Sequence, residues 1–473
     1  MGPPLDPTSV QIPIAHPVER LVAAVAGWPE PSILESGPGF GPAGRWSVLA
    51  AYPRLVFEAV GPRWTIRTDS GGFEQGDDPL GRLEALTREY RLADSADEPD
   101  PDARPFQGGL IGFLGYDLAP LLERLPRKAP RDSRLPDVRM ALYDTAVAVD
   151  HQNGAAAILA WDVVGEGRDA VARRARFWRR ALRDAVASPR RVERSTLGEA
   201  VSNFTRDEYL DAVRRAIEYV HAGDVFQVNL SQRFEARGKV DALDLHLRLR
   251  RESPAPFSAL LRWRDRAVVS ASPESFHQTR GERIVTRPIK GTRPRGDSPE
   301  ADAALAAELT ASPKDRAELT MIVDLERNDL GRVCRYGSVA VTEPLTLETY
   351  ADVHHLVATV QGKLREGVGP VDVVRATFPG GSITGAPKIR AMQIIDELEP
   401  TRRSLYTGAI GYLSRGGTSG FNIAIRTALV EGDRVRYQVG GGIVADSSPE
   451  DEYEETLHKG RGLRRVLAGE DAP

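Results

Sequence analysis

Apolar and polar positions along the chain follow strand-like periods in some segments and helical periods in others, which predicts a mixed α/β protein. Residues 141–149 form an apolar run typical of a buried strand. Two polar, proline-containing stretches, 93–105 and 187–202, interrupt these patterns and are expected to be exposed. The second stretch is the expected main boundary, and it separates an N-terminal region (1–190) from a larger domain (200–468).

The larger domain opens with a helix and then a strand. Thr205 and Glu208 have the spacing of a capping box, and apolar residues follow at helical intervals. Residues 225–234 then alternate, with Phe226 on the apolar face and Gln227 on the polar face. The polar face meets solvent or lines a site, and solvent is the favoured alternative.

Two glutamates occupy informative positions. Glu274 follows a strand-like segment, 266–271, where loops often carry catalytic groups, although an exposed turn residue is the alternative. Glu318 belongs to a helix that Ser312 can cap, and its neighbours three, four and seven positions later are apolar. A carboxylate on an apolar stripe needs a cation, either from Lys314 one turn earlier or from a metal ion.

A second acidic helix is expected to begin at Ser448. Glu452 and Glu455 share one face at three-residue spacing, and Lys459 lies one turn further along. Carboxylates from two separate helices, without a histidine or thiolate cluster, suit Mg²⁺, which binds through one or two carboxylates plus an anionic substrate. The alternative is that these residues form a solvated helix start.

A small-residue loop, 379–388, opens into a helix-like segment, 389–398. Its backbone N–H groups, the hydroxyls of Ser382 and Thr384 and the helix dipole suit a carboxylate or phosphate. The loop lacks the phosphate-loop pattern of nucleotide-hydrolysing enzymes, which argues against ATP.

Composition restricts the class of protein. The chain has 473 residues, of which 41% are hydrophobic and 27% charged, so it can bury a large core. Its net charge of −4 offers no general attraction to nucleic acid or an anionic membrane. The single cysteine, Cys334, cannot form an intramolecular disulfide, and no apolar run has the length of a membrane span. A reducing, cytoplasmic location is expected.

Lys290 is the most informative single residue. Pro288 stiffens the approach to it and Gly291 permits a turn after it, so its amine could be directed into a cavity as a nucleophile. The alternative is that Lys290 adds one cation to a basic loop containing Arg287 and Arg293. Taken alone, the position of Lys290 favours an ordinary cation in a basic loop. The motifs around it favour a nucleophile instead.

Four motifs together resemble those of the chorismate-utilising enzymes. They are Pro-Ile-Lys-Gly-Thr at 288–292, Asp-Leu-Glu-Arg-Asn-Asp-Leu-Gly-Arg at 324–332, Gly-Ser-Ile-Thr-Gly-Ala-Pro-Lys at 381–388 and Gly-Gly-Gly-Ile-Val-Ala-Asp-Ser at 440–447. The resemblance is clearest over 204–467, and the first part resembles the N-terminal region of anthranilate synthase and aminodeoxychorismate synthase large components. It implies an α/β fold in which two sheets pack as a sandwich surrounded by helices.

The resemblance also assigns roles to residues. Glu274 matches the general acid, and Glu318, Glu452 and Glu455 match the glutamates that hold Mg²⁺. His355, which its sequence alone would place in the core, matches an active-site histidine. Positions that match groups holding the substrate are Thr292, Ser382, Thr384, Tyr406, Arg426, Gly440, Gly441, Gly442 and Lys459.

Position 290 separates two branches of this family. Anthranilate synthases have alanine there, whereas aminodeoxychorismate synthases have a lysine that attacks C2 of chorismate as hydroxyl leaves C4, before ammonia adds at C4. An amine nucleophile must be unprotonated, so burial or nearby cations must lower the pKa of Lys290, while Glu274 must stay protonated. The resemblance therefore implies amination at C4, for 4-aminobenzoate and folate synthesis, with anthranilate synthesis as the alternative.

Gln227 favours ammonia over water as the nucleophile. The isochorismate and salicylate synthases resemble this strand but have a lysine there that activates water, and a neutral amide cannot act as that base. The chain has no nucleophile elbow of the kind a glutaminase carries, so a separate glutamine amidotransferase subunit is expected. A third alternative is a catalytically silent subunit that senses tryptophan or supports an amidotransferase, which the full set of matched catalytic positions disfavours.

Glu35 and Ser36 belong to an Ile-Leu-Glu-Ser element at 33–36. It resembles the Leu-Leu-Glu-Ser element of the tryptophan pocket in feedback-inhibited anthranilate synthases and departs from it at the first residue. A four-residue match is equally compatible with ordinary core packing.

Overall fold

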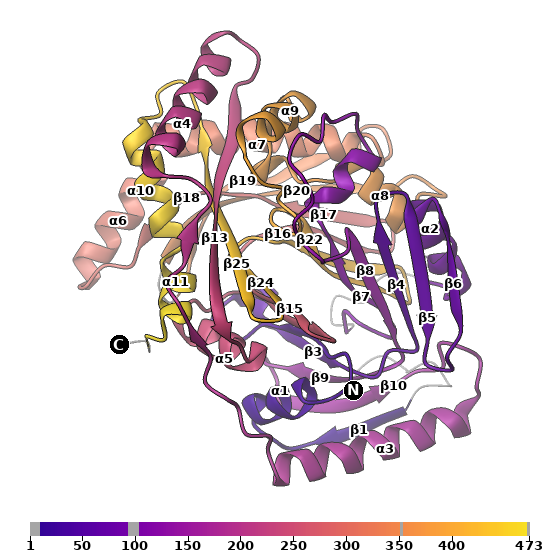
Figure 1. Cartoon of the computed structure of the whole chain (residues 1–473). Helices are drawn as coiled ribbons and strands as arrows, with labels where there is room; N and C mark the ends of the chain where they lie inside the picture. Colours follow the sequence, from indigo (N-terminus) through magenta and orange to yellow (C-terminus); the bar gives the residue numbers. More distant parts are fainter. Residues whose placement is uncertain (1–9, 93–103, 351–352, 471–473) are drawn as a thin grey trace.

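A computed structural model describes residues 10–92, 104–350 and 353–470. Two large antiparallel sheets face each other and helices surround them, which confirms the predicted α/β sandwich (Figure 1). The expected break at 93–105 lies largely outside the described residues.

The first sheet has 13 strands within the described residues. In spatial order they are β1 (Val10–Ile14), β10 (Ala155–Ala160), β9 (Thr145–Asp150), β3 (Trp46–Ala50), β2 (Ser32–Glu35), β14 (Phe257–Trp263), β15 (Arg266–Ser272), β24 (Thr427–Glu431), β25 (Arg434–Ile443), β13 (Gln227–Lys239) and β11 (Thr196–Leu197), with β12 (Val201–Ser202) and β21 (Gly385–Ala386) also paired to β13.

The second sheet has 12 strands in the same part of the chain. They are β18 (Ile289–Pro294), β20 (Val353–Lys363), β17 (Arg283–Arg287), β16 (Ser275–Arg280), β23 (Thr418–Ile423), β22 (Ala409–Ser414), β7 (Gly109–Leu114), β8 (Val138–Tyr143), β4 (Leu55–Val60), β5 (Arg63–Thr68) and β6 (Phe73–Asp77), with β19 (Ala340–Thr349) paired to β20. Both sheets combine strands from either side of the expected boundary at 187–202, so the two-part division stays a prediction.

Helices cover the outer faces of both sheets and the end where the site lies. Their bounds are α1 (Val18–Ala26), α2 (Pro79–Glu89), α3 (Arg168–Ala187), α4 (Arg206–His221), α5 (Ala242–Glu252), α6 (Pro299–Ala311), α7 (Pro313–Gly331), α8 (Pro370–Thr377), α9 (Lys388–Leu398), α10 (Pro449–Lys459) and α11 (Arg461–Ala468), with 3-10 turns η1 (Gly41–Gly44), η2 (Tyr116–Leu121) and η3 (Gly381–Ile383). Among the described helices, none is both long and apolar enough to cross a membrane.

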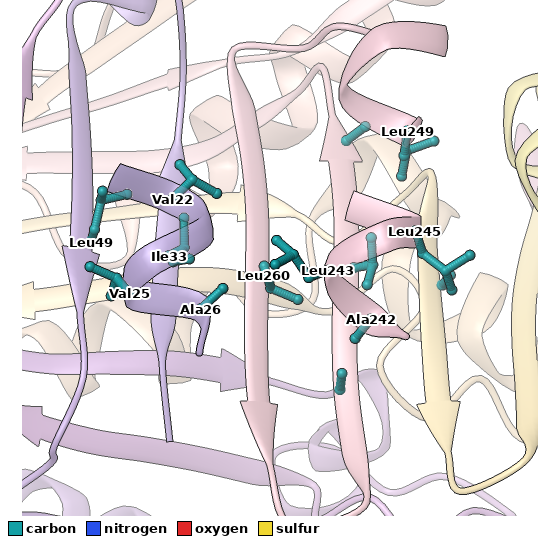
Figure 2. Close-up of a cluster of buried hydrophobic side chains, with 14 of the residues drawn as sticks. Val22, Val25, Ala26, Ile33, Leu49, Ala242, Leu243, Leu245, Leu249 and Leu260 are labelled. Atoms are coloured by element: carbon teal, nitrogen blue, oxygen red, sulfur yellow. The ribbon is translucent and has the colours of Figure 1, made fainter. Parts of the chain in front are cut away.

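Apolar side chains fill the space between the sheets and beneath the helices. Figure 2 shows side chains of α1 and α5, such as Val22 and Leu243, gathered over Ile33 and Leu260 of the first sheet. Each aliphatic side chain buried in this way stabilises the fold by about 1.5–3 kcal/mol relative to an exposed one. These cores fix the strand ends that carry the polar residues described below.

The helix starts predicted from capping residues are confirmed. Thr205 and Glu208 form a capping box at α4, and Ser312 and Ser448 cap α7 and α10 through their side chains. The apolar run 141–149 was expected to be one strand, but it is two, because the chain turns at Asp144 between β8 and β9.

The polar face of β13 does not meet solvent, so the favoured alternative for that strand was wrong. Gln227 and Ser231 are fully buried, whereas Phe226, expected on the apolar face, is 71% exposed. Ser231 donates to Glu399, a residue from a distant loop that packs over this face, at 2.6 Å between Oγ and Oε1. A tertiary contact of this kind leaves no mark on the local alternation of residues.

Candidate active site

One cavity of about 650 Å³ collects most of the predicted site residues from both sheets and from α7 and α10. Glu274 and Lys290 line the cavity from the side of the second sheet. Asn229 and the glycines of β25 line it from the side of the first sheet. The predicted residues in its wall are Glu274, Lys290, Thr292, Glu318, His355, Ser382, Tyr406, Arg426, Gly440, Gly442, Glu452, Glu455 and Lys459.

Two predicted substrate residues lie just behind the wall. The Thr384 hydroxyl donates to the Gly380 carbonyl at 2.9 Å, and the Asn229 N–H donates to the Thr384 carbonyl at 2.9 Å. A Cβ on Gly441 would lie 2.8 Å from Glu452 Oε2 and 3.0 Å from Glu455 Oε1. Thr384 therefore shapes the loop, and Gly441 leaves room for the acidic pair.

Lys290 lies on β18 with its side chain in the cavity. Gly291 has φ +77°, and a Cβ there would lie 2.8 Å from Leu309 and 2.9 Å from Asp315, so only glycine fits this turn. Burial lowers the pKa of the Lys290 amine, and Glu318 acts in the opposite direction. A larger fraction of the amine is therefore neutral than in an exposed lysine, as a nucleophile requires.

Glu274 follows β15 and is 6% exposed. The Ser272 hydroxyl fixes the turn, since it donates to the Ile423 carbonyl at 2.6 Å and accepts from the Glu274 N–H at 3.3 Å. Burial raises the pKa of the Glu274 carboxyl, while a hydrogen bond with Ser382 and the Lys290 charge act to lower it. Burial thus increases the protonated fraction of the Glu274 carboxyl relative to that of an exposed glutamate.

His355 lies on β20 opposite Thr292, and its Nδ1 is 2.9 Å from the Thr292 hydroxyl. Burial and then the Arg426 charge lower the pKa of His355 to about 4, so the imidazole is neutral near pH 7. Arg426 has φ +49°, a strained conformation for a long side chain that is commonest at functional sites.

The predicted Mg²⁺ glutamates face the cavity from two helices, Glu318 from α7 and the other two from α10. Glu452 Oε1 accepts from the Ser447 hydroxyl at 2.6 Å, but Glu452 Oε2 is buried without a hydrogen-bond partner among the described residues. Burial raises the pKa of Glu452. Burial also acts to raise the pKa of Glu455, but the Lys459 amine lies 2.6 Å from its carboxylate and the net effect is a lowered pKa.

These carboxylates fit Mg²⁺ by that orphaned oxygen and by their oxygen-only donor set. Within the described ranges, no group of three or more His, Cys, Asp or Glu side chains is arranged so that it could hold a metal ion, so these glutamates would need ligands from elsewhere. In the described part of the chain, no ion pair or hydrogen bond joins Glu318 to Lys314. The structural ion pair that the sequence offered as the alternative to a metal site is therefore not formed.

The family model for chorismate binding enzyme matches residues 47–465. The chain belongs to the chorismate-binding enzyme family. It is 43% identical to "Aminodeoxychorismate synthase component 1" of Salmonella typhimurium, with 98% of each chain covered.

Two further members of the chorismate-binding family are anthranilate synthases. The chain is 41% identical to "Anthranilate synthase component 1" of Thermus thermophilus, over 88% of this chain and 89% of the relative. The crystal structure of anthranilate synthase component I from Streptococcus pneumoniae has a TM-score of 0.78 at 31% identity, and the match covers 91% and 94% of the two chains.

Within this chorismate-binding fold, a buried ion pair that the sequence did not reveal supports the site. Arg403 Nη2 lies 2.8 Å from Glu399 Oε1 and also donates to the Asn229 carbonyl at 2.8 Å, and Nη1 donates to the Ile383 carbonyl at 3.2 Å. Its guanidinium lies 5.5 Å from the Tyr406 ring centroid. The pair has i, i+4 spacing in an irregular segment, so helical periodicity could not signal it.

The motif at 324–332 contacts Lys388, the last residue of the small-residue loop 379–388. Lys388, which opens α9, contacts Asp329 of α7 and donates to the Thr377 carbonyl at 2.8 Å. Burial and the neighbouring Asp329 raise the pKa of Glu326 to about 8. This cluster explains why two of the chorismate-family motifs occur together although no residue of the first lines the cavity.

The Glu35–Ser36 element lies apart from this cavity. Glu35 is buried, with His246 Nε2 at 2.8 Å from Oε2 and Arg250 Nε at 2.9 Å from Oε1. The Ser36 hydroxyl donates to the Ala43 carbonyl at 3.0 Å. These contacts are those of a packed polar cluster, and a tryptophan-binding role stays a prediction.

Proposed function

We propose that this chain is the chorismate-aminating component of aminodeoxychorismate synthase, which makes 4-amino-4-deoxychorismate for 4-aminobenzoate and folate synthesis. The observation that carries the proposal is Lys290, which lies in the same cavity as Glu274 and has a lowered pKa. The full-length relative from Salmonella typhimurium supports it.

The first step forms a bond between Lys290 Nζ and C2 of chorismate. The ring double bonds shift, the bond from C4 to its hydroxyl breaks, and Glu274 donates the proton with which hydroxide leaves as water. The result is a lysine adduct, a Glu274 carboxylate and one water molecule. Neutral Lys290 and protonated Glu274 are the states that burial favours in each residue.

The second step adds ammonia at C4. The double bonds shift back, the bond between Lys290 and C2 breaks, and the new C4 ammonium returns one proton to Glu274. Chorismate and ammonia thus give 4-amino-4-deoxychorismate and water, with both residues restored to their starting states.

Substrate carboxylates are assigned to the polar wall of the cavity. Arg426 and Tyr406 with the Ser382 hydroxyl would orient the substrate, alongside Thr292, Lys459 and the backbone of Gly440 and Gly442. Glu318, Glu452 and Glu455 would hold Mg²⁺, which neutralises a substrate carboxylate when bound. His355, being neutral, would accept or donate a hydrogen bond without adding charge.

A partner subunit is part of the proposal. "Component 1" in the relative's name implies a second component. We infer that it is a glutamine amidotransferase that supplies ammonia in the cytoplasm, since Cys334 is buried and its pKa is raised by burial to about 11, unlike that of a nucleophilic thiol.

Anthranilate synthase component 1 is the second candidate, favoured by the 41% identity to the Thermus thermophilus relative. A silent tryptophan-sensing subunit is disfavoured, because every residue matched to catalysis lines or borders one cavity. The purified chain, incubated with chorismate, Mg²⁺ and ammonium, is expected to form 4-amino-4-deoxychorismate, identified by mass spectrometry. Release of anthranilate and pyruvate would establish the second candidate instead, and absence of turnover the third.

A further inference from the structure

The outer face of α3 carries arginines that the site around Lys290 does not use. The helix packs on β1 and β10 and turns its other face to solvent. The exposed arginines of this face are Arg168, Arg173, Arg176, Arg179, Arg180 and Arg183. Among the described residues, Arg183 pairs with Asp184 and the other five have no ion pair. This positive face contrasts with the net charge of −4 of the whole chain, so it suits an acidic partner.

A cavity of about 420 Å³ adjoins this face at Phe177. Aromatic rings form part of its wall, since the Tyr52 ring centroid lies 5.9 Å from that of Phe177 and 6.3 Å from that of Trp178. Phe177 is 44% exposed although its side chain is large and apolar. The cavity is large enough to receive an aromatic or long aliphatic side chain of another molecule.

The aromatic wall is fixed by its surroundings. Tyr52 has φ +58°, a strained conformation for a residue with a side chain, and its N–H donates to the Pro29 carbonyl at 3.0 Å. Trp28 packs edge-on against Trp178 with 4.8 Å between the ring centroids. A cavity with a fixed wall costs a partner less free energy to enter than one that must be opened.

Charged residues at the rim restrict what can enter the cavity. Arg67 Nη2 has no hydrogen-bond acceptor among the described residues, and Glu30 Oε1 lies 3.6 Å from it. Arg54 pairs with Asp69 at 3.1 Å and with Asp144 at 3.4 Å. Carboxylates beside the cavity repel a uniformly anionic polymer such as nucleic acid. They leave room for an apolar side chain whose acidic neighbours lie further along α3.

Helical geometry places the arginines beside the cavity. Arg173 lies four positions before Phe177 and Arg180 three positions after it, so all three share one face of α3. Figure 1 shows α3 at the end of the molecule opposite α7 and α10, the helices that line the cavity containing Lys290. A partner on α3 is therefore separate from a subunit that delivers ammonia to that cavity.

We propose that the arginine face of α3 and the adjoining cavity form a docking surface for a protein partner that presents an acidic segment with one large apolar side chain. The apolar side chain fills the cavity beside Phe177, and the flanking carboxylates pair with Arg173 and Arg180. Aromatic residues and arginine carry most of the binding energy at protein interfaces, and both gather here. An anionic membrane fits less well, because α3 buries its apolar face in the fold and exposes one large apolar side chain.

The test uses two fluorescent synthetic peptides of about ten residues, both rich in aspartate and glutamate. One has a central tryptophan, and the other has serine in its place. Fluorescence anisotropy with the full chain is expected to show that the tryptophan peptide binds at least about tenfold more tightly. Raising sodium chloride from about 50 to about 300 mM is expected to weaken the binding of both peptides, because the ion pairs are exposed to solvent.

Substitutions on α3 locate the binding. Phe177→Ser is expected to remove the preference for tryptophan, and Arg173→Ser combined with Arg180→Ser is expected to weaken both peptides about five- to tenfold. The matched control is Arg316→Ser, an exposed arginine of α7 without an ion pair among the described residues, which is expected to leave both affinities unchanged. None of these residues lines the cavity containing Lys290, so the result does not depend on the proposed amination.

Equal affinity for the two peptides, no binding of either, or unchanged binding in the α3 variants would overturn the docking surface. A single-stranded oligonucleotide and vesicles containing phosphatidylserine are measured in parallel. If either bound the α3 face more tightly than the tryptophan peptide, the proposal would also be overturned, and the face would belong to a nucleic acid or a membrane instead.

Discussion

At the scale of single residues, the site combines an amine and an acid whose pKa values burial moves toward each other. Loss of contact with solvent lowers the pKa of the Lys290 amine and raises the pKa of the Glu274 carboxyl. An exposed lysine would be almost entirely protonated at pH 7 and an exposed glutamate almost entirely ionised. The cavity therefore increases both the neutral fraction of the Lys290 amine and the protonated fraction of the Glu274 carboxyl.

Replacing the nucleophile is the most direct test of this assignment. Lys290→Ala is expected to reduce the rate of 4-amino-4-deoxychorismate formation at saturating ammonium by at least about a hundredfold, because the covalent route is lost. Product formation is measured by chromatography. Lys363→Ala, an exposed lysine on β20, serves as the control. A wild-type amination rate in Lys290→Ala would refute the role.

The pH dependence of kcat/KM for chorismate follows from the same two groups. Activity is expected to rise with pH as Lys290 deprotonates, on a limb below the ordinary value of 10.5, because burial lowers its pKa. It is expected to fall at higher pH as Glu274 ionises, on a limb above 4.5, because burial raises that pKa. His355 adds no limb near neutrality, since its pKa is about 4.

The check is a pH profile of wild type against Glu274→Gln. The amide cannot ionise, so the falling limb should disappear from whatever activity remains. A falling limb that persists unchanged in this variant would assign it to another group.

At the scale of elements, the buried pair Glu399–Arg403 joins β13 to the small-residue loop 379–388, since Arg403 donates to the carbonyls of Asn229 and Ile383. Arg403→Leu leaves Glu399 buried without its cation, so the free energy of unfolding is expected to fall by about 3–5 kcal/mol. The exposed pair Arg214–Asp211 on α4 is the control, and Arg214→Ala is expected to cost less than about 1 kcal/mol. Urea unfolding measures both, and equal losses would contradict the argument.

Elements with local signals were predictable from the sequence. The starts of α4, α7 and α10 follow from capping side chains that act within one turn, so the carboxylates they carry were placed correctly on helices. The burial of the polar face of β13 was not predictable. It depends on Glu399, which lies 168 positions from Ser231 in the sequence, and no local pattern encodes such a contact.

The convergence of the site residues came from motif resemblance and not from periodicity. Glu274 and Lys290 are each compatible with an exposed loop when read alone, and only the sandwich brings the ends of β15 and β18 to the same cavity. The sequence used Gln227 only to predict that ammonia, and not water, is the nucleophile. That its side-chain amide is buried without a hydrogen-bond partner among the described residues is visible only in the structure.

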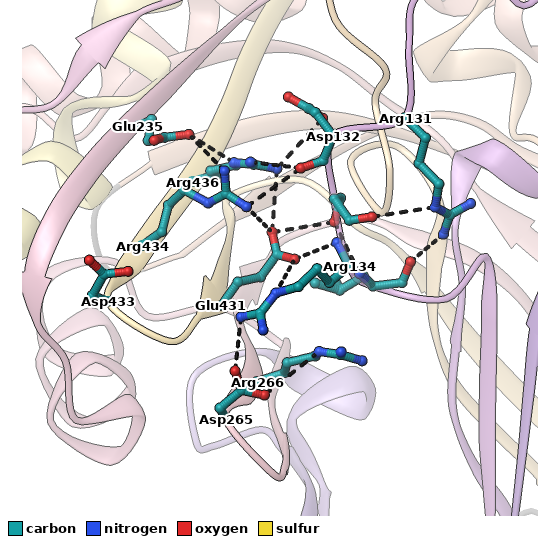
Figure 3. A network of polar contacts seen from close by, with 12 residues as sticks. Arg131, Asp132, Arg134, Glu235, Asp265, Arg266, Glu431, Asp433, Arg434 and Arg436 are labelled. Carbon is teal, nitrogen blue, oxygen red and sulfur yellow. Dashed lines mark hydrogen bonds and ion pairs between the residues drawn. The ribbon is translucent and has the colours of Figure 1, made fainter.

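At the scale of the whole molecule, the two sheets join the N-terminal and C-terminal parts of the chain. β2 pairs with β14 in the first sheet and β7 pairs with β22 in the second. Figure 3 shows a further link, in which the segment 131–134 meets buried Glu431, which accepts from the Arg134 N–H at 2.6 Å. The cavity lined by Lys290 and Glu274 therefore depends on strands whose partners lie in the other part.

Separate expression of residues 1–190 and 200–468 tests this dependence. Each fragment would expose unpaired strand edges and apolar faces, so each alone is expected to aggregate, while co-expression restores a soluble complex. Size-exclusion chromatography and thermal unfolding provide the measurements. Cooperative unfolding and chorismate turnover by 200–468 alone would show instead that this part is self-sufficient.

The wall position of Lys290 also has a practical consequence for inhibitor chemistry. The chain contains only seven lysines, and Lys388 and Lys459 are each in contact with a carboxylate, as are Lys128 and Lys239. An electrophile that mimics the substrate ring would meet three lysines in the wall of the cavity, Lys290, Lys314 and Lys459, and of these Lys290 has its pKa lowered by burial. Covalent labelling followed by peptide mass mapping is expected to mark Lys290, and labelling at the other six lysines in its place would contradict the argument.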